Sequence, residues 1–372
     1  MRDYTTAADA IVHYYEEEVV APTCDEAGYT THTCTDCYYS YDDSFIDAIG
    51  HDYDEILIRP TTTTDGCTTH TCANCGNTYV DNVISSDSVF ALSGANMVLG
   101  STLNMNFFIM ATNLSGTDYY AEITHYAEDG TVKTVIPYDQ WDDRGTYIVV
   151  TLTGLAARQM SDLIEVVIYH GNGVQAGVLW TDSIRGYAMR ILEKQDAETK
   201  TLLVDMLNYG AAAQSFFGYN TDDLANNQLT EAQQAYATQS VTCTDQRVKG
   251  TNYYGSTLTL KDRIMLSVYF KNITTDMYAV VTYTDHKGNY HETRVEGSAF
   301  AKYNSTVYGV VVDDLVVADG DQLVTVTVYD ANGNAVASAS DTVNSYAARM
   351  MTGDPMFEAV AKFTTSAYAY FH

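Results

Sequence analysis

Apolar residues recur at helical spacing in two neighbouring stretches, residues 184–192 and 203–217. This spacing predicts two amphipathic helices joined by a short polar gap. The same pair of patterns returns at residues 345–351 and 357–371. Aromatic residues recur at corresponding places in the two pairs, with Tyr187 corresponding to Tyr346, Tyr209 to Phe363 and Phe217 to Phe371. The small residues 210–213 allow the second helix of the first pair to lie close to a neighbouring element.

Strand-like segments precede each helical pair. Residues 85–182 and 241–341 hold short runs rich in β-branched and aromatic residues, separated by turn sequences such as Asn332-Gly333. The run that starts at Gly100 matches the run that starts at Gly255. Short strands at this spacing predict an antiparallel sandwich. We therefore predict a mainly β fold with appended helices, consisting of two tandem Ig-like β-sandwich plus helical-hairpin units.

The first 84 residues contain a different repeat, with a period of about 38 residues. DAIVHYYEE at 9–17 matches DAIGHDYDE at 47–55, and PTCDEAGYTTHTCTDC at 22–37 matches PTTTTDGCTTHTCANC at 60–75. Each module is too short to build a hydrophobic core alone, so we expect a covalent or metal link. The predicted domains are residues 1–45 and 46–84 for the small modules, and residues 85–228 and 229–372 for the larger units. Residues 229–239 are interpreted as a semi-rigid linker.

Six of the seven cysteines lie in these two modules. Each module offers three Cys and one His in the same order, ending in C-x2-C, which is a zinc-binding pattern. The predicted ligands are His13, Cys24, Cys34 and Cys37 in the first module and His51, Cys67, Cys72 and Cys75 in the second. Four protein ligands leave no open coordination position, so we expect two structural zinc ions.

Disulfide bonds or free thiols are the alternative to zinc. Cys24 aligns with Thr62 and Cys67 with Tyr29, so the third cysteine shifts while the count of three is kept. An odd number per module favours a Cys3His site over disulfides closed within a module, although six cysteines can also pair in an oxidising compartment. His32 and His70 repeat as well and are spare ligand candidates, with surface strand positions as the simpler interpretation.

The charge balance limits the class of partner. The chain has 48 acidic and 19 basic residues and a net charge of -29. This charge excludes nucleic-acid binding, which needs a basic face, and disfavours anionic membranes. The sequence has no apolar run of membrane-spanning length and no signal-peptide core, so we expect no membrane insertion. Because the first repeat starts part-way through a module, we expect a fragment of a longer secreted protein.

Catalytic patterns are sparse. His125, His286 and His291 lie on or beside predicted strands, do not recur at aligned positions, and are interpreted as surface residues. The acidic pairs 142–143, 222–223 and 313–314 lack calcium-loop spacing and are interpreted as solvated loops. We therefore expect a protein that is not an enzyme, with no catalytic residues.

Two motifs carry a resemblance to known proteins. They are H-x-Y…APTCDEAGYTTHTCTDC…GHDYDE in the small modules and LNYGAAAQSFFGYNTDDLAN in the first larger unit. The whole chain resembles repeat-built secreted or cell-surface adhesin-like proteins of gut Firmicutes, chiefly Clostridia. The resemblance implies an extracellular, non-enzymatic modular binding protein that contacts a host protein such as immunoglobulin or mucin. A carbohydrate-binding or accessory module of a polysaccharide-degrading surface enzyme and a structural spacer are the alternatives.

Overall fold

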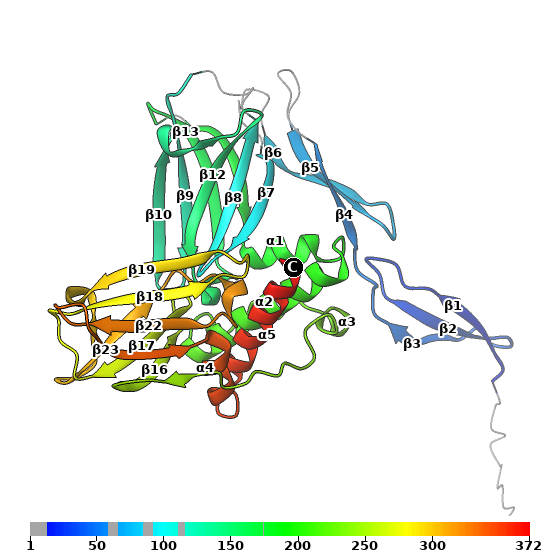
Figure 1. Ribbon diagram of the computed structural model, residues 1–372. Coiled ribbons are helices and arrows are strands. Elements are labelled where there is room, and N and C mark those ends of the chain that lie inside the picture. Colours follow the sequence, from blue (N-terminus) through cyan, green and yellow to red (C-terminus); the bar gives the residue numbers. More distant parts are fainter. Residues whose placement is uncertain (1–12, 59–65, 85–91, 111–115, 174) are drawn as a thin grey trace, which may run out of the picture. The chain divides into compact units, whose positions relative to one another are not determined.

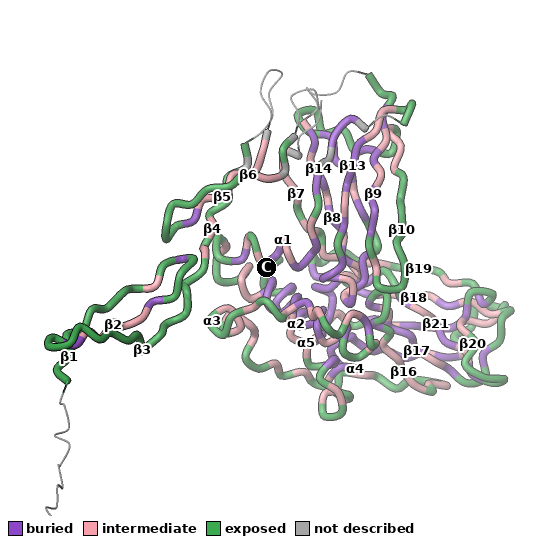
Figure 2. Tube along the Cα trace, turned by 180° about the vertical axis from the view of Figure 1, so that it is seen from behind, coloured by how far each residue is buried: buried purple, intermediate pink, exposed green. Residues whose placement is uncertain are grey.

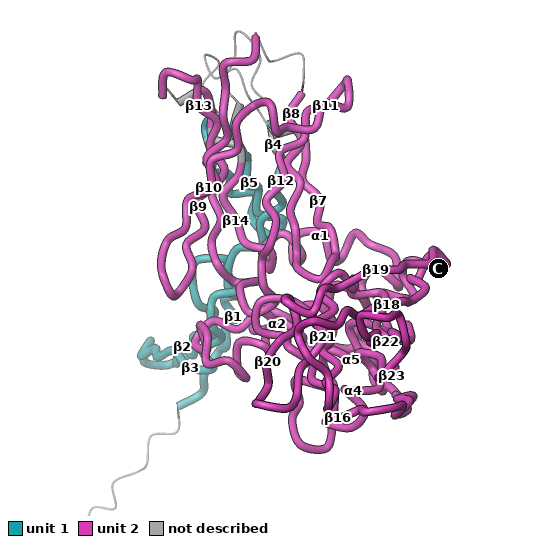
Figure 3. The backbone as a smooth tube through the Cα atoms, turned by 60° about the vertical axis from the view of Figure 1, so that its left-hand side comes forward, with its two compact units in different colours: residues 1–89 teal, residues 90–372 magenta. Residues whose placement is uncertain are grey.

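The computed structural model describes residues 13–58, 66–84, 92–110, 116–173 and 175–372. The chain divides into two compact units, residues 1–89 and 90–372 (Figure 3). The expected boundary between residues 84 and 85 and the repeat segment 60–65 lie outside the described residues. Within the described part, no helix is long and apolar enough to cross a bilayer.

The first unit contains two three-stranded antiparallel sheets with the same strand order (Figure 1). The first consists of β1 (Tyr15–Val20), β2 (Gly28–Cys34) and β3 (Ser40–Ile46), and the second of β4 (Tyr53–Ile58), β5 (Gly66–Cys72) and β6 (Thr78–Ile84). Their registers correspond, since Tyr15 pairs with Cys34 and Tyr53 pairs with Cys72. The sequence repeat is therefore a structural repeat.

These sheets have little hydrophobic core. Every residue of β1 and all but one of β3 are exposed, whereas β2 between them is half-buried with a buried residue at each end (Figure 2). One aromatic cluster per sheet replaces the core: Tyr15, His32 and Tyr41 in the first, and Tyr53, His70 and Tyr79 in the second. The histidine ring stacks on the third residue of each cluster, with centroids 4.8 Å and 4.3 Å apart. His32 and His70 therefore pack within the sheets and are not metal ligands in this arrangement.

Two further bonds fix these histidines. Nε2 of His32 lies 2.9 Å from Oδ1 of Asp43, and Nε2 of His70 lies 2.9 Å from Oδ1 of Asp81. A single aromatic cluster buries too little apolar surface to stabilise a module of this size. The small sheets need an additional link.

The second unit begins with two four-stranded sheets, in the orders β10-β9-β13-β14 and β11-β12-β8-β7. Their strands are β7 (Leu92–Leu99), β8 (Leu103–Met110), β9 (Tyr119–Ala127), β10 (Gly130–Pro137), β11 (Asp142–Asp143), β12 (Tyr147–Leu155), β13 (Leu163–His170) and β14 (Gln175–Asp182). Residues of β8 alternate between buried and half-buried, as a strand with one core face does. Phe107 of β8 packs against Trp180 of β14 with ring centroids 5.2 Å apart, so the two sheets share a core.

The second half of this unit has the same strand order, with the short strand β15 added beside β23. Its sheets are β15-β23-β22-β18-β19 and β16-β17-β21-β20. Their strands are β15 (Val248–Lys249), β16 (Tyr253–Thr259), β17 (Met265–Lys271), β18 (Tyr278–Thr284), β19 (Tyr290–Glu296), β20 (Ala301–Lys302), β21 (Val307–Val312), β22 (Val324–Tyr329) and β23 (Ala335–Asp341). The mainly β fold with appended helices is thus confirmed, while its assignment to the Ig-like class stays a prediction.

Helices follow each pair of sheets. They are α1 (Ile184–Leu192), α2 (Ala197–Phe217) and α3 (Glu231–Gln234) in the first half, and α4 (Val343–Met350) and α5 (Pro355–Tyr370) in the second. The side chain of Asp196 accepts a hydrogen bond from the backbone N–H of Thr199 and caps α2, which ends at Gly218 in the left-handed conformation. A Cβ atom at Gly210 would lie 2.5 Å from Sδ of Met160, so the expected close approach of α2 is present.

The two halves form one body through these helices. Tyr209 of α2 stacks on Phe363 of α5 with ring centroids 5.5 Å apart. These two residues occupy aligned positions in the repeats, so the contact resembles one across a twofold axis. Arg158 Nη2 also donates to Asp262 Oδ1 at 3.2 Å.

The expected linker is bound to the first half. In α3 and its flanks, Thr238 N donates to Asp205 Oδ1 at 3.0 Å and Gln233 Nε2 donates to Glu193 Oε1 at 2.9 Å. Residues 229–239 are therefore held along α1 and α2, and the expected domains 85–228 and 229–372 share one core.

A pH-dependent ion pair holds α1 to the loop after α2. Arg185 Nη2 donates to Asp223 Oδ2 at 2.9 Å, and this guanidinium keeps the pKa of Asp223 below its ordinary value of 3.8. A lowered folded-state pKa contributes stability above the ordinary value, and this contribution is lost as the pH falls through the folded pKa. We expect Asp223→Asn to lower the Tm at neutral pH and the difference from wild type to close below pH 3.8. Thermal unfolding across acidic pH checks this, with Asp222→Asn as the control; an undiminished difference at low pH would contradict it.

Candidate metal centre

Three ligand candidates of the second module come together at the start of β4 and the end of β5. His51 precedes β4, Cys72 is the last residue of β5, and Cys75 lies in the turn that follows. The backbone N–H of Gly76 donates to Cys72 O at 2.9 Å, and Gly76 has a φ of 72°. This tight turn brings both sulfur atoms of C-x2-C to one side, where Cys75 Sγ lies 3.4 Å from Nδ1 of His51.

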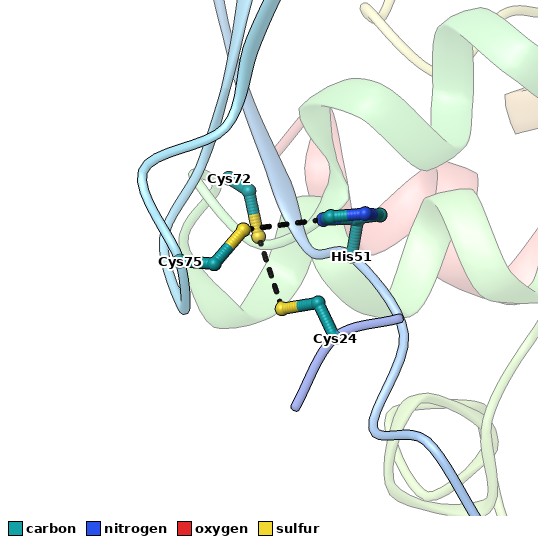
Figure 4. A group of neighbouring side chains, drawn as sticks. All are labelled: Cys24, His51, Cys72 and Cys75. Carbon is teal, nitrogen blue, oxygen red and sulfur yellow. Dashed lines mark hydrogen bonds between the residues drawn. The ribbon is translucent and has the colours of Figure 1, made fainter. Parts of the chain in front are cut away.

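The fourth residue of this cluster comes from the first module (Figure 4). Cys24 lies in the loop between β1 and β2, and its sulfur is 3.8 Å from that of Cys72. The candidate ligand atoms of Cys24, His51, Cys72 and Cys75 all lie within 4.8 Å of one another. We call these four residues the intermodule cluster.

Backbone hydrogen bonds explain why Cys24 reaches the second module. The N–H groups of Ile49 and Gly50 donate to the carbonyls of Thr23 at 3.0 Å and Cys24 at 3.2 Å. These bonds fasten the segment leading to His51 against the Cys24 loop. The position of Cys24 is therefore set by backbone pairing that the spacing of ligands along the chain does not reveal.

The neighbouring carboxylate orients the histidine. Asp25 Oδ1 lies 2.9 Å from Nε2 of His51, which leaves Nδ1 facing the sulfur atoms. A carboxylate behind a ligating imidazole is a common second layer of metal sites, because it fixes the tautomer and raises the basicity of the ligand. No signal in the ligand spacing points to Asp25, although its place next to Cys24 is visible in the sequence.

The other predicted ligands fall into a smaller group. His13 Nδ1 lies 3.3 Å from Cys34 Sγ and 3.5 Å from Cys37 Sγ. Among the residues with a described structure, this group has three members, and we call it the three-residue cluster. Tyr38 has a φ of 63° where Gly76 has 72°, so both C-x2-C turns have the same form despite the different residue.

The expected division of ligands therefore needs correction. Cys24 belongs with the ligands of the second module and not with those of the first, for the backbone reason given above. Cys67 lies on β5, with its sulfur 3.9 Å from Thr69 Oγ1, and is in neither cluster. Strand β5 pairs Cys67 with Ile58, the last residue of β4, which places it at the opposite end of the hairpin from Cys72.

The electrostatics of the intermodule cluster favour a cation. Burial raises the pKa of Cys72. Hydrogen bonds from His51 and from backbone N–H groups lower the pKa by more than burial raises it, and the resulting value is about 6. The hydrogen bond with Cys72, with a further contribution from Asp25, raises the pKa of His51 to about 9. Burial and the adjacent thiols of Cys75 and Cys72 raise the pKa of Cys24 to about 12. Because Cys24 lies next to these thiols, it stays protonated when Cys72 is a thiolate. A metal cation bound between them would compensate the negative charge of a second thiolate on Cys24.

The three-residue cluster has the same tendency. The hydrogen bond from His13 lowers the pKa of Cys34 to about 6, and the backbone N–H of Cys37 adds to the effect. The Cys34 side chain is buried, whereas His13 and Cys37 are exposed. This cluster can present two sulfurs and one nitrogen to a metal ion from one open side.

Two histidines of the second unit, His125 and His286, are structural. His125 is buried, contrary to the expected surface position, and its Nε2 lies 2.9 Å from Asp162 Oδ2. Tyr219 donates its hydroxyl to the same carboxylate oxygen, which ties β9 to the segment after α2. His286 is also buried and bonds to Asp319 at 2.8 Å. These are satisfied polar links in the core.

Comparison with known proteins adds little. A scan against protein-family models finds no match, and neither does a search of curated proteins. The solved structures similar to this chain include the crystal structure of a tetra-tandem repeat in the extending region of a large adhesion protein. That match has 11% sequence identity, covers 90% of this chain and 68% of the other, and has a TM-score of 0.18. A TM-score this low does not indicate a shared fold.

Proposed function

We propose that this chain is a non-enzymatic, extracellular modular binding protein of the cell surface. In this proposal residues 13–84 act as a metal-linked spacer, and residues 90–372 present the binding surface. The observation that carries the proposal is the intermodule cluster, in which Cys24 of one module joins three residues of the next. A structural metal bound by four ligands from two modules would fix one module to the next. An array of such modules would therefore be stiff.

Zinc is the metal that this cluster suits best. Two sulfur ligands on a tetrahedral zinc ion, each about 2.3 Å from the metal, are about 3.8 Å apart. The sulfurs of Cys24 and Cys72 have this separation. A sulfur and an imidazole nitrogen on the same ion are about 3.5 Å apart, which compares with 3.4 Å for Cys75 and His51. A disulfide needs sulfurs about 2.05 Å apart, so the spacing suits zinc better than a Cys24–Cys72 bond.

Chelation tests the zinc proposal on the whole chain. Because metal binding free energy is folding free energy in modules of this size, we expect removal of zinc to unfold the small sheets and spare the larger unit. Hydrogen exchange before and after addition of a chelator should show lost protection in residues 13–58 and 66–84 and unchanged protection in residues 90–372. The proposal would be wrong if protein purified without chelator contained no metal in a stoichiometric amount.

Exposed aromatic residues at the end of α5 favour a protein partner. Tyr368 and Tyr370 are 41% and 43% exposed, and the neighbouring Phe371 is 43% exposed. Large aromatic side chains that lose little conformational entropy are preferred contacts in protein interfaces. We propose a host glycoprotein or an immunoglobulin as the partner of this surface, in keeping with the adhesin-like resemblance of the chain.

A second candidate function rests on a separate row of aromatics. Tyr254, Tyr303 and Tyr269 follow one another on and beside strands β16, β20 and β17, with successive ring centroids 5.6 Å and 5.5 Å apart. Tyr303 is 59% exposed and Tyr254 is 44% exposed. Tyr269 is half-buried, so two exposed tyrosine rings at this place are available to stack against sugars, and polysaccharide binding is the alternative.

A binding panel with matched variants separates these functions. The full chain is tested against immunoglobulins, mucin, serum proteins, starch and plant-wall polysaccharides, together with Tyr368→Ala/Tyr370→Ala and Tyr254→Ala/Tyr303→Ala. A protein partner at α5 predicts at least about tenfold weaker binding for the first double variant only. Polysaccharide binding predicts loss for the second variant only. If no ligand of the panel binds, the spacer role remains for this part of the chain.

A further inference from the structure

We infer that the three-residue cluster of His13, Cys34 and Cys37 is an acceptor site that a cysteine thiolate from another module completes, with a zinc ion between them. The inference rests on the proposed zinc-linked spacer and goes beyond it. The fourth ligand of the first site is then a cysteine on a loop of the same kind as the one that holds Cys24.

The two clusters have the same three-ligand base. His13, Cys34 and Cys37 each lie 38 residues before His51, Cys72 and Cys75. The nitrogen-to-sulfur distances are 3.3 Å and 3.5 Å in the first cluster, against 3.4 Å for the pair His51 and Cys75. Both C-x2-C turns have a residue with positive φ directly after the second cysteine.

The fourth ligand is where the clusters differ. In the intermodule cluster it is Cys24, which is delivered by the loop between the first two strands of a different module. Among the described residues the first cluster receives no such loop, and its His13 and Cys37 are exposed. Zinc in a structural site takes four ligands, so a three-ligand base with an open side accepts one more.

Thiolate is the ligand that the pattern favours. The loop around Cys24 approaches through main-chain bonds to residues 49 and 50, just before His51. The loop that carries Cys24 lies between the first two strands of its module, and its cysteine reaches the ligands of the next module. We therefore assign a cysteine on a loop of this kind as the fourth ligand of the first site, which would link modules end to end.

The test uses cobalt(II) as a spectroscopic substitute for zinc in the full chain. Cys24→Ser/Cys72→Ser/Cys75→Ser removes the intermodule cluster and leaves the three-residue cluster as the reporting site. A peptide with the sequence of residues 20–29 is then added, with the same peptide carrying serine in place of cysteine as the control. N-acetylcysteine at equal concentration distinguishes a module loop from a free thiol.

We expect the cysteine peptide to raise the thiolate-to-cobalt absorption by about half, because the number of bound thiolates rises from two to three. The serine peptide should leave the spectrum unchanged, and N-acetylcysteine should act only at higher concentration. Equal effects of N-acetylcysteine and the peptide would overturn the assignment to a module loop. An unchanged spectrum with the peptide, or three thiolates bound without it, would overturn the acceptor site. Failure of the zinc proposal itself is distinguishable, since wild-type protein would then bind no cobalt at the intermodule cluster either.

Discussion

Cys24→Ser is expected to weaken zinc binding at the ligands of the second module by on the order of 100-fold, although Cys24 belongs to the first module. The sulfur of Cys24 lies 3.8 Å from that of Cys72, and no other described cysteine is grouped with these ligands. Structural zinc in small modules contributes about 10–16 kcal/mol, so one of four ligands accounts for about 3 kcal/mol. Competition with a chromophoric chelator measures the change in affinity.

Cys67→Ser is the matched control for this substitution. Cys67 is the third cysteine of the second module in the sequence, but its sulfur lies outside both clusters. We expect Cys67→Ser to leave zinc affinity and stoichiometry unchanged. If Cys67→Ser weakened binding and Cys24→Ser did not, the ligands would be divided by module, as their order along the chain suggests.

Phe363→Ala is expected to destabilise the whole of the larger unit by about 3–5 kcal/mol. Phe363 is 1% exposed and stacks on Tyr209 across the contact between α5 and α2. Both tryptophans, Trp141 and Trp180, are buried in the other half, so their fluorescence reports on a region that contains no substituted residue. Because the halves share one core, we expect the tryptophan transition to move to lower denaturant together with the circular dichroism transition.

Tyr368→Ala on the same helix provides the control. Tyr368 is 41% exposed, so its removal should change stability by less than about 1 kcal/mol. If Phe363→Ala lowered only the circular dichroism transition and left the tryptophan transition in place, the two halves would unfold independently. The predicted division at residues 228 and 229 would then describe two separate domains.

Local patterns in the sequence were sufficient for the repeats and for most elements. The helical spacing in residues 203–217 and the small residues at 210–213 predicted α2 and its close packing, which the contacts of Gly210 with Met160 confirm. The Cys/His pattern identified seven of the residues that gather in the two clusters. These predictions hold because periodicity, turn residues and ligand type act over short stretches of chain.

Burial of single polar residues was less accessible from the sequence. His125 and His286 look like surface strand residues, yet each is buried against an aspartate from a distant segment. Asp162 follows His125 by 37 residues, and no local pattern marks the pair. A buried histidine depends on a partner brought by topology, which sequence spacing does not encode.

The sequence by itself determined that the chain is built from two kinds of repeat, with strands, helices and Cys/His ligand sets at corresponding positions. Only the tertiary structure decided how the repeats join. Backbone bonds from residues 49 and 50 deliver Cys24 to the ligands of the next module, and the stacking of Tyr209 on Phe363 merges two repeats into one core. In both places residues from different repeats meet, and such contacts depend on loop paths and packing that residue spacing within one repeat does not specify.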